Sequence, residues 1–453
     1  RSVSQETDTR ARSILKDRLD ASRSASTSVN QSEVPIDQWS SNWLSYTRYD
    51  GVMVTGREMK DAPIGVVEAL RQFTMAGGTL IVTGSTWQPP SDWRPQATGT
   101  AGISELYSGF GVVVAAPDQL GFERFVSSIA DHISRSAQPW RSNRTIEEAN
   151  NLFSVVEDLQ VPKRGLLVLM IGFAVAIGPV NLWLLAKYKK RMWLLWTVPT
   201  FSLLTCLAVW IYATAAEGWS GHEKTATLTI FDQPNQTATT IGWSAFYAPI
   251  TPGGGLRYDL TTELTPQISR FSGSYYYYGR SDGRSRSVTL NDTQHLANGW
   301  VIARVPSHFQ IRKPAKTVRE RLNFRANVSG LEVVNGLGVN VKQLWYADDS
   351  GTTYKADPIA KGEAKPLNKV AGTASADAWA WRNLYAAEWV GSGGSIDRVT
   401  RAAQSWLRPN TYIAVLDGDP FLESGLGKSE SRKAEAIVIG YVDPESAENG
   451  AAR

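Results

Sequence analysis

The sequence predicts a multidomain membrane protein with an α/β domain, a two-helix transmembrane hairpin and an antiparallel β-sandwich-like domain. The hairpin prediction depends on residues 165–186 and 192–215, two apolar runs without a charged side chain. A helix needs about 20 apolar residues to cross roughly 30 Å of hydrocarbon, and each run is that long. Before these runs the sequence has continuous apolar strands with an amphipathic helix between them, and after them the apolar residues alternate. The predicted parts are residues 1–33 (a polar helix and linker), 34–150 (the α/β domain), 165–215 (the hairpin) and 222–445 (the β-rich domain).

A basic turn joins the two apolar runs and predicts the topology. Its cations are Lys187, Lys189, Lys190 and Arg191. Positive charges concentrate on the cytoplasmic side of membrane proteins, so we expect this turn in the cytoplasm and both polar portions of the chain outside it. Because residues 1–30 lack an apolar signal core, this topology also leads us to expect a signal sequence or an earlier helix upstream. The alternative is a buried helical hairpin, but core helices are rarely so long and free of charge.

The residues before the hairpin have the pattern of a parallel α/β sheet. Residues 49–56 and 79–84 are continuous apolar strands, and each ends in a Gly turn. Between them lies an amphipathic helix that stops at a Gly-Gly pair. Strand, helix and strand in this order, with continuous apolar strands, are typical of a βαβ unit whose sheet is covered on both faces. Residues 109–116 predict a further strand, and residues 122–133 predict an amphipathic helix.

After the hairpin the pattern changes to short alternating strands separated by Gly, Pro, Asn and Asp. Many short strands with such turns are typical of an antiparallel sandwich or barrel. The expected strands are residues 225–231, 287–290, 301–305, 331–334, 341–345, 411–416 and 436–441, and residues 376–407 are expected to be partly helical.

Composition argues against several classes of partner and site. The net charge is +4 over 453 residues, with no run of Lys or Arg outside the hairpin turn, so we expect no nucleic-acid partner. The single cysteine, Cys206, lies in the second apolar run, which excludes an intramolecular disulfide and a multi-cysteine metal site. The four histidines lack the spacing that brings two ligands onto one face, so we expect no metal and no cofactor.

Several segments resemble known bacterial proteins. Residues 49–54, the helix that follows and residues 77–82 resemble the class I glutamine-amidotransferase-like fold, a flavodoxin-like α/β arrangement, in its degenerate membrane-protein form. Residues 178–181 and 407–421 are similar to segments of a poorly characterised group that joins such a domain to a transmembrane hairpin and a β-rich domain. The resemblance implies the bacterial inner membrane, with both large domains extracytoplasmic. It also implies contact with membrane lipid and with membrane or envelope proteins, including a transport ATPase or a MoxR-type AAA system.

The sequence departs from the catalytic amidotransferases. Those enzymes place a nucleophilic cysteine on a turn after a buried strand, whereas residues 84–87 read Gly-Ser-Thr-Trp and no cysteine exists outside the apolar runs. The glutaminase reaction is therefore excluded. A serine hydrolase would need Ser85 as nucleophile, His132 as base and Asp131 or Glu123 to orient it, but the G-x-S-x-G pattern is missing.

Two sets of residues are candidates for a protein interface. Tyrosine and arginine are enriched at interfaces, although a β-hairpin with alternate tyrosines in the core is an alternative for the first set. The second set follows two buried strands, where a doubly wound sheet keeps a crevice, and we expect it to contact another subunit or the chain's own β domain. The first set is Tyr275, Tyr276, Tyr277, Tyr278 and Arg280, and the second is Arg57 and Trp87.

Together these observations favour a non-enzymatic, membrane-anchored scaffold or accessory subunit of a bacterial cell-envelope complex. It would bind protein partners through its extracytoplasmic domains. The alternatives are a periplasmic serine hydrolase or amidase that uses the α/β domain, and a glycan- or ligand-binding module on the β domain.

Overall fold

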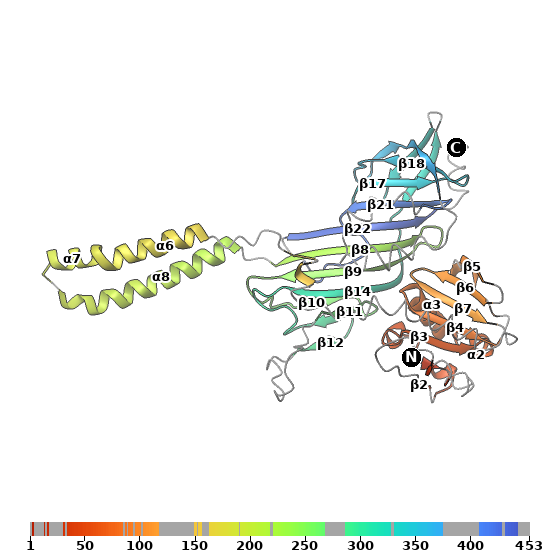
Figure 1. Ribbon diagram of the computed structural model, residues 1–453, viewed down its shortest axis with the longest axis horizontal. Coiled ribbons are helices and arrows are strands. Elements are labelled where there is room, and N and C mark those ends of the chain that lie inside the picture. The colour runs from red at the N-terminus through yellow and green to blue at the C-terminus, as the bar shows by residue number, and fades with distance from the viewer. Residues whose placement is uncertain are drawn as a thin grey trace.

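The computed structural model contains a mixed α/β domain, two long apolar helices and a large β-rich domain (Figure 1). The predicted fold class is confirmed at this level. The structure describes residues 34–84, 87, 89–93, 96–100, 103–116, 149–151, 153–155, 163–189, 191–217, 221–267, 286–327, 330–374, 407–427 and 431–442, together with 2–3, 13, 16–17 and 30–31.

The N-terminal domain is built on a seven-stranded sheet with the order β2-β1-β3-β4-β7-β6-β5. Its central strands are parallel: β3 (Gly51–Thr55), β4 (Thr79–Thr83) and β7 (Gly111–Ala116). The strands β5 (Gln96–Thr100) and β6 (Ile103–Ser108) add an antiparallel edge, and β1 (Ser2–Val3) and β2 (Asn30–Gln31) form the other edge. Strands β3, β4 and β7 were predicted from the sequence, whereas β1, β2, β5 and β6, which lack a continuous apolar run, were not.

Helices connect and cover the parallel strands. Helix α2 (Gly56–Asp61) begins at a capping box, in which the side chains of Thr55 and Glu58 each bond the other's backbone N–H. Helix α3 (Ile64–Met75) connects β3 to β4 and buries Leu70 and Phe73 completely. It ends before Gly77, whose φ of 106° is a conformation that favours glycine. The predicted helix at residues 122–133 lies outside the described residues.

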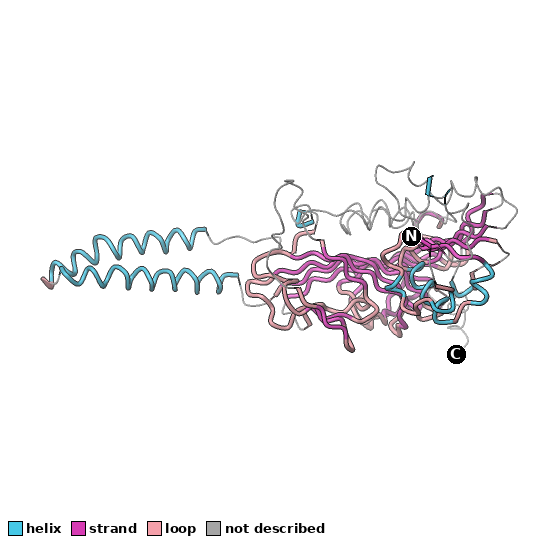
Figure 2. The backbone as a smooth tube through the Cα atoms, turned by 90° about the horizontal axis from the view of Figure 1, so that it is seen from below, coloured by secondary structure: helices cyan, strands magenta, loops and turns pink. Residues whose placement is uncertain are grey.

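Two apolar helical segments lie side by side and extend away from the β domain (Figures 1 and 2). The first consists of α6 (Lys163–Val175), a π-helical turn η4 (Ala176–Val180) that contains Pro179, and α7 (Asn181–Lys187). The second begins with the 3₁₀ turn η5 (Arg191–Trp193) and continues as α8 (Leu194–Glu217). Asn181 Nδ2 donates to Thr197 Oγ1 at 3.0 Å and links the two segments.

These helices are not core helices of the folded domains. The stretches long and apolar enough to cross a membrane are Met170–Lys187 and Leu194–Tyr212, of which 6% and 0% are buried. A core helix buries its apolar side chains, whereas here Leu195 and Trp196 are more than three-quarters exposed. The two helices therefore indicate an association with a membrane.

The β-rich domain is built on a nine-stranded sheet with the order β11-β14-β9-β8-β22-β21-β17-β18-β20. Neighbouring strands are antiparallel except β8 and β22, which pair in parallel along their whole length and correct the expectation of a purely antiparallel sheet. The strand bounds are β8 (His222–Asp232), β9 (Thr237–Tyr247), β11 (Glu263–Pro266), β14 (Ser307–Thr317), β17 (Asn340–Ala347), β18 (Thr352–Ala356), β20 (Asn368–Thr373), β21 (Thr411–Asp417) and β22 (Ser431–Tyr441).

Two three-stranded sheets pack on one face of the large sheet. One contains β10 (Leu256–Tyr258), β12 (Val288–Leu290) and β13 (Gln294–Leu296), and its Leu256 packs with Phe246 and Phe309. The other contains β15 (Leu322–Asn327), β16 (Gly330–Asn335) and β19 (Ala364–Pro366), and its Phe324 stacks on Tyr346. The predicted strand at residues 301–305 is wrong: these residues form a turn with a bridge between Ile302 and Val305. Most of residues 376–407 lie outside the described residues.

Residues that precede α6 in the chain pack on the opposite face of the large sheet. Phe153 and Val155 precede α6, yet they share one buried cluster with Ala226, Trp243 and other residues that follow α8. His308 Nε2 donates to Phe153 O at 3.0 Å. The chain before the helices and the chain after them are therefore packed into one body.

Candidate functional site

The α/β domain contacts the β domain at one edge of the large sheet (Figure 1). Trp43 lies in the 3₁₀ turn η2 (Trp43–Ser45), is 1% exposed and packs in the core of the α/β domain. Its indole Nε1 reaches out of that core and donates to Thr261 O in the β domain at 2.8 Å. A single side chain thus supports one domain and binds the other.

Arg312 on β14 completes this contact from the other side. Its guanidinium lies 5.9 Å from the centre of the Trp43 ring and donates to the carbonyls of Thr47 (3.4 Å) and Ala76 (3.5 Å). Glu263 on β11 pairs with the same guanidinium, which is 6% exposed. A buried charge with its acid and carbonyl acceptors in place fixes the orientation of one domain on the other.

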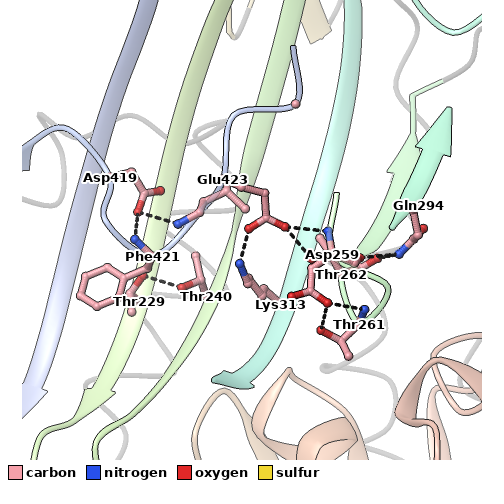
Figure 3. A network of polar contacts seen from close by, with 12 residues as sticks. Thr229, Thr240, Asp259, Thr261, Thr262, Gln294, Lys313, Asp419, Phe421 and Glu423 are labelled. Carbon is pink, nitrogen blue, oxygen red and sulfur yellow. Dashed lines mark hydrogen bonds and ion pairs between the residues drawn. The ribbon is translucent and has the colours of Figure 1, made fainter. Parts of the chain in front are cut away.

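A second polar cluster holds the loop between β21 and β22 against the large sheet (Figure 3). We call residues 418–427 the strap. Glu423 of the strap pairs with Lys313 on β14 and accepts from Asp259 N (3.0 Å) and Thr262 Oγ1 (3.2 Å). Asp419 accepts from Thr227 Oγ1 on β8 at 2.6 Å and from Phe421 N at 2.8 Å.

Glu223 and Arg432 add to the strap cluster from the strands below it. Glu223 on β8 accepts from the hydroxyl of Ser424 and from Gly425 N at 3.1 Å. Arg432 on β22 donates through Nη2 to Leu422 O at 2.8 Å. The strap is therefore held to the sheet through three carboxylates, the Lys313 ammonium and the Arg432 guanidinium.

The carboxyl groups of the strap cluster have shifted pKa values of opposite sign. Burial raises the pKa of Asp419 and of Glu223, although their hydrogen bonds and the charge of Arg432 act in the other direction. Burial is the largest single influence on the pKa of Glu423 and acts to raise it, but the charge and hydrogen bond of Lys313 together with the backbone hydrogen bonds, including that from Asp259 N, hold that pKa below the ordinary value. Glu423 is thus the carboxylate that keeps its charge most firmly.

An open cavity of about 650 Å³ lies beside the strap, where β22 runs past the end of β21. Lys342 pairs there with Asp417 (3.3 Å) and Glu435 (3.0 Å). The cavity offers charges of both signs, and its chemistry suits binding of a polar group. Its other lining residues are Lys224, Thr225, Val339, Gly418, Asp419, Arg432, Lys433 and Ala434.

The predicted interface residues have different environments in the structure. Arg57 is exposed on α2, with 81% of its side chain open to solvent and Asp61 at 4.0 Å. Trp87 is half-buried, packs against the core of the α/β domain and lies 5.9 Å from Trp93, edge to face. Tyr275, Tyr276, Tyr277, Tyr278 and Arg280 lie outside the described residues, as do Ser85 and His132. The interface role of all these residues stays a prediction.

Three of the four residues predicted to set the topology are described, and they lie at the far end of the helix pair. Lys187 and Lys189 are exposed there, and the Lys187 ammonium lies 5.2 Å from the centre of the Trp183 ring. Arg191 begins η5, and Lys190 lies outside the described residues. Among the described residues, no three His, Cys, Asp or Glu side chains are grouped so as to hold a metal ion.

The residues that connect the domains and hold the strap were not predicted from the sequence. Arg312 and Lys313 are consecutive residues of one strand, so they point to opposite faces of the sheet, and each meets an acid. The available signal was this pair of charges between the apolar Ile311 and Pro314. Charges inside a strand are costly unless partners exist, but the sequence does not show that Glu263 and Glu423 are those partners.

No protein-family model matches this chain, and no curated protein sequence matches it. One solved structure with detectable similarity is the yeast delta-COP-I mu-homology domain in complex with a Dsl1 WxWxV peptide. The likeness covers 49% of this chain and 95% of that chain, with 8% identity and a TM-score of 0.18. A score that low carries no argument about fold or function.

Proposed function

We propose that this chain is a non-enzymatic, membrane-anchored scaffold or accessory subunit of a bacterial cell-envelope complex. The observation that carries the proposal is the joining of residues from both sides of the helices. Phe153, before α6, shares a core with Ala226, after α8, and Trp43 bonds Thr261. Because the segments before and after the helices fold together, they lie on the same side of the membrane. The two helices therefore cross the membrane in opposite directions, as a hairpin.

The charge of the connecting turn supports one orientation of this hairpin. Lys187 and Lys189 lie at the end farthest from the folded domains, and the adjoining Lys190 and Arg191 add to the charge. By the positive-inside rule this end lies in the cytoplasm. Both large domains are then on the extracytoplasmic side of the inner membrane.

The α/β domain serves this function as a binding module. Its parallel strands β3, β4 and β7 with α3 between β3 and β4 support the flavodoxin-like, amidotransferase-like assignment. The sequence lacks the cysteine of the glutaminase reaction, because Cys206 lies in α8. The α/β domain therefore binds partner proteins and catalyses no reaction. The resemblance suggests a transport ATPase or a MoxR-type AAA system among these partners.

The cavity beside the strap favours a second candidate function. Its charges of both signs are the lining expected where the β domain binds a polar ligand or glycan. We favour the scaffold function because the contact through Trp43 and Arg312 fixes the α/β domain on the β domain, and the helices attach both to the membrane.

Purification in mild detergent, followed by mass spectrometry of the co-eluting proteins, tests the scaffold function. We expect Arg57→Glu to reduce recovery of the principal partner several-fold, because a reversed charge on an exposed interface disrupts its complement. The thermal midpoint should stay unchanged, since surface substitutions usually shift stability by at most about 0.5 kcal/mol.

The matched control is Arg325→Glu, an exposed arginine on β15. Equal partner recovery from Arg57→Glu and Arg325→Glu would contradict the role of Arg57. Arg57 is substituted without Trp87, because Trp87 packs on the core of the α/β domain and its substitution would also affect folding.

A further inference from the structure

Two loops of the β domain lie at the end of the large sheet from which the helix pair emerges (Figures 1 and 2). We call residues 248–255 and 297–306 the rim. The first loop follows Tyr247, which pairs with His222 at the start of β8, and the second precedes Ser307, which pairs with Phe246. Helix α8 ends at Glu217, five residues before β8 begins, and a chain of that length spans at most about 18 Å. The rim therefore stays close to the membrane end of the anchor.

The rim combines exposed aliphatic side chains with a cation and contains no carboxylate. Ile250 is 48% exposed and Val305 is 37% exposed. Arg304, next to Val305 in the chain, is exposed, and Trp300 is half-buried. Neither loop contains Asp or Glu. Aliphatic residues beside arginine and tryptophan are the composition of surfaces that enter the lipid headgroup layer.

Hydrogen bonds hold the two loops to each other. Arg304 N donates to Ala248 O at 2.7 Å, and Ala303 N donates to Thr251 Oγ1 at 3.2 Å. Arg304 has a φ of 62°, a left-handed conformation that is costly for a side chain larger than glycine. The first bond joins the two loops at this residue, next to the exposed Val305, and its acceptor lies two residues before the exposed Ile250 along the first loop.

A second set of contacts holds the rim to the body of the domain. Trp300 Nε1 donates to Ser287 O at 3.1 Å, and the Arg286 guanidinium lies 5.4 Å from the centre of the Trp300 ring. Trp300 also packs against the buried cluster around Phe309. The rim is thus packed onto the β domain through Trp300.

We infer that the rim binds the surface of the bilayer that holds the helices, with Ile250 and Val305 in the headgroup layer and Arg304 at the level of the lipid phosphates. This inference rests on the proposed membrane anchoring. The charge of the rim is complementary to anionic lipid, since it has a cation and no carboxylate. A contact at the rim together with the helices attaches the β domain at two points and fixes its tilt on the membrane.

The test uses the full chain in nanodiscs of mixed phosphatidylcholine and phosphatidylglycerol, with Cys206→Ser as background. An environment-sensitive fluorophore is attached at Gly253→Cys, where a side chain meets no neighbour. Reference labels are Gln236→Cys, in the turn at the other end of β8, and Leu203→Cys, which is exposed in the middle of α8. We expect a blue-shifted emission at residue 253, quenched by headgroup-labelled lipid, and no shift at residue 236.

Two double substitutions identify the cause of that shift. Ile250→Ser with Val305→Ser should abolish it, whereas Ile64→Ser with Val34→Ser, the same exposed residue types on the α/β domain, should leave it intact. A label at residue 253 that stays in water, or a shift that survives Ile250→Ser with Val305→Ser, would overturn the inference. If residue 203 is quenched by acyl-chain-labelled lipid in that experiment, membrane anchoring stands without the rim. If residue 203 is not quenched, anchoring and rim contact both fail.

Discussion

Trp43→Ala is expected to destabilise the α/β domain by about 3–5 kcal/mol and to separate it from the β domain. The substitution leaves a cavity among fully buried side chains, and large-to-small changes of an aromatic residue cost this much. It also removes the indole that donates to Thr261 and that lies beside the Arg312 guanidinium. Hydrogen–deuterium exchange should therefore become faster both in α3 and in β14.

Trp43→Phe separates the two roles of this side chain. The smaller ring still fills much of the core but cannot donate to Thr261, so we expect a loss of about 1 kcal/mol from the missing hydrogen bond, with a further part from the lost volume. Faster exchange should then be concentrated at the domain contact. Exchange in α3 and β14 that does not change in Trp43→Ala would contradict this account of how the domains are joined.

Glu423→Gln is expected to destabilise the β domain by about 3 kcal/mol at pH 7. Lys313 is 5% exposed and pairs with this carboxylate, and removing one member of a buried pair leaves an uncompensated charge. Replacing both residues, with Glu423→Gln and Lys313→Met, should recover much of the loss, because two neutral side chains avoid that cost. The coupling free energy between the two residues is measured by thermal unfolding in detergent of the unchanged protein, Glu423→Gln, Lys313→Met and the double variant.

The same pair has a defined pH dependence. The folded-state pKa of Glu423 lies below its ordinary value of 4.5, so its stabilisation is fully present above about pH 4.5 and is lost as the pH falls through the folded pKa. Asp419 and Glu223 act in the opposite sense: with raised pKa values, their contribution is present below the ordinary carboxyl pKa and is lost as the pH rises. The destabilisation by Glu423→Gln should therefore shrink as the pH falls below about 4.5, and a constant difference would contradict the pairing.

The parts of the fold that could be predicted from sequence are those in which one local pattern decides the structure. Strands β3 and β4 are continuous apolar runs because both faces of the sheet are covered, and helix α3 between them has one apolar face. The two long apolar helices, α6–α7 and α8, are apolar all round, which is the composition of helices that can cross a membrane. In each case the surroundings determine the pattern of apolar residues within one continuous segment, so the pattern can be recognised without knowing the rest of the fold.

Strand β14 shows why other parts could not be predicted. It contains Arg312, Lys313 and Pro314, residues that argue against a central strand when seen alone. The acids Glu263 and Glu423 come from distant segments, and the register shift between Lys313 and Lys316 accommodates the proline. These conditions exist only after the chain has folded.

The candidate site was predicted less completely than the fold. Arg57 is exposed as its position after β3 suggested, but Trp87 turns back onto Trp93, a contact that no local pattern indicates. The strap cluster combines residues from five separate segments, and its carboxylates resemble ordinary turn residues in the sequence. Long-range polar contacts of this kind have no periodic signal.

Cysteine accessibility in intact cells tests the central claim, that an anchor hairpin holds both domains on the extracytoplasmic side. In a Cys206→Ser background, single cysteines are placed at Tyr188 in the basic turn, at Gln236 in the β domain and at Lys60 on α2, all exposed. With the outer layer of the cell permeabilised, a membrane-impermeant thiol reagent should label residues 60 and 236, and should label residue 188 only after the inner membrane is disrupted. Labelling of residue 188 while the inner membrane is intact would contradict the account. So would a difference between residues 60 and 236, in which one is labelled and the other is not.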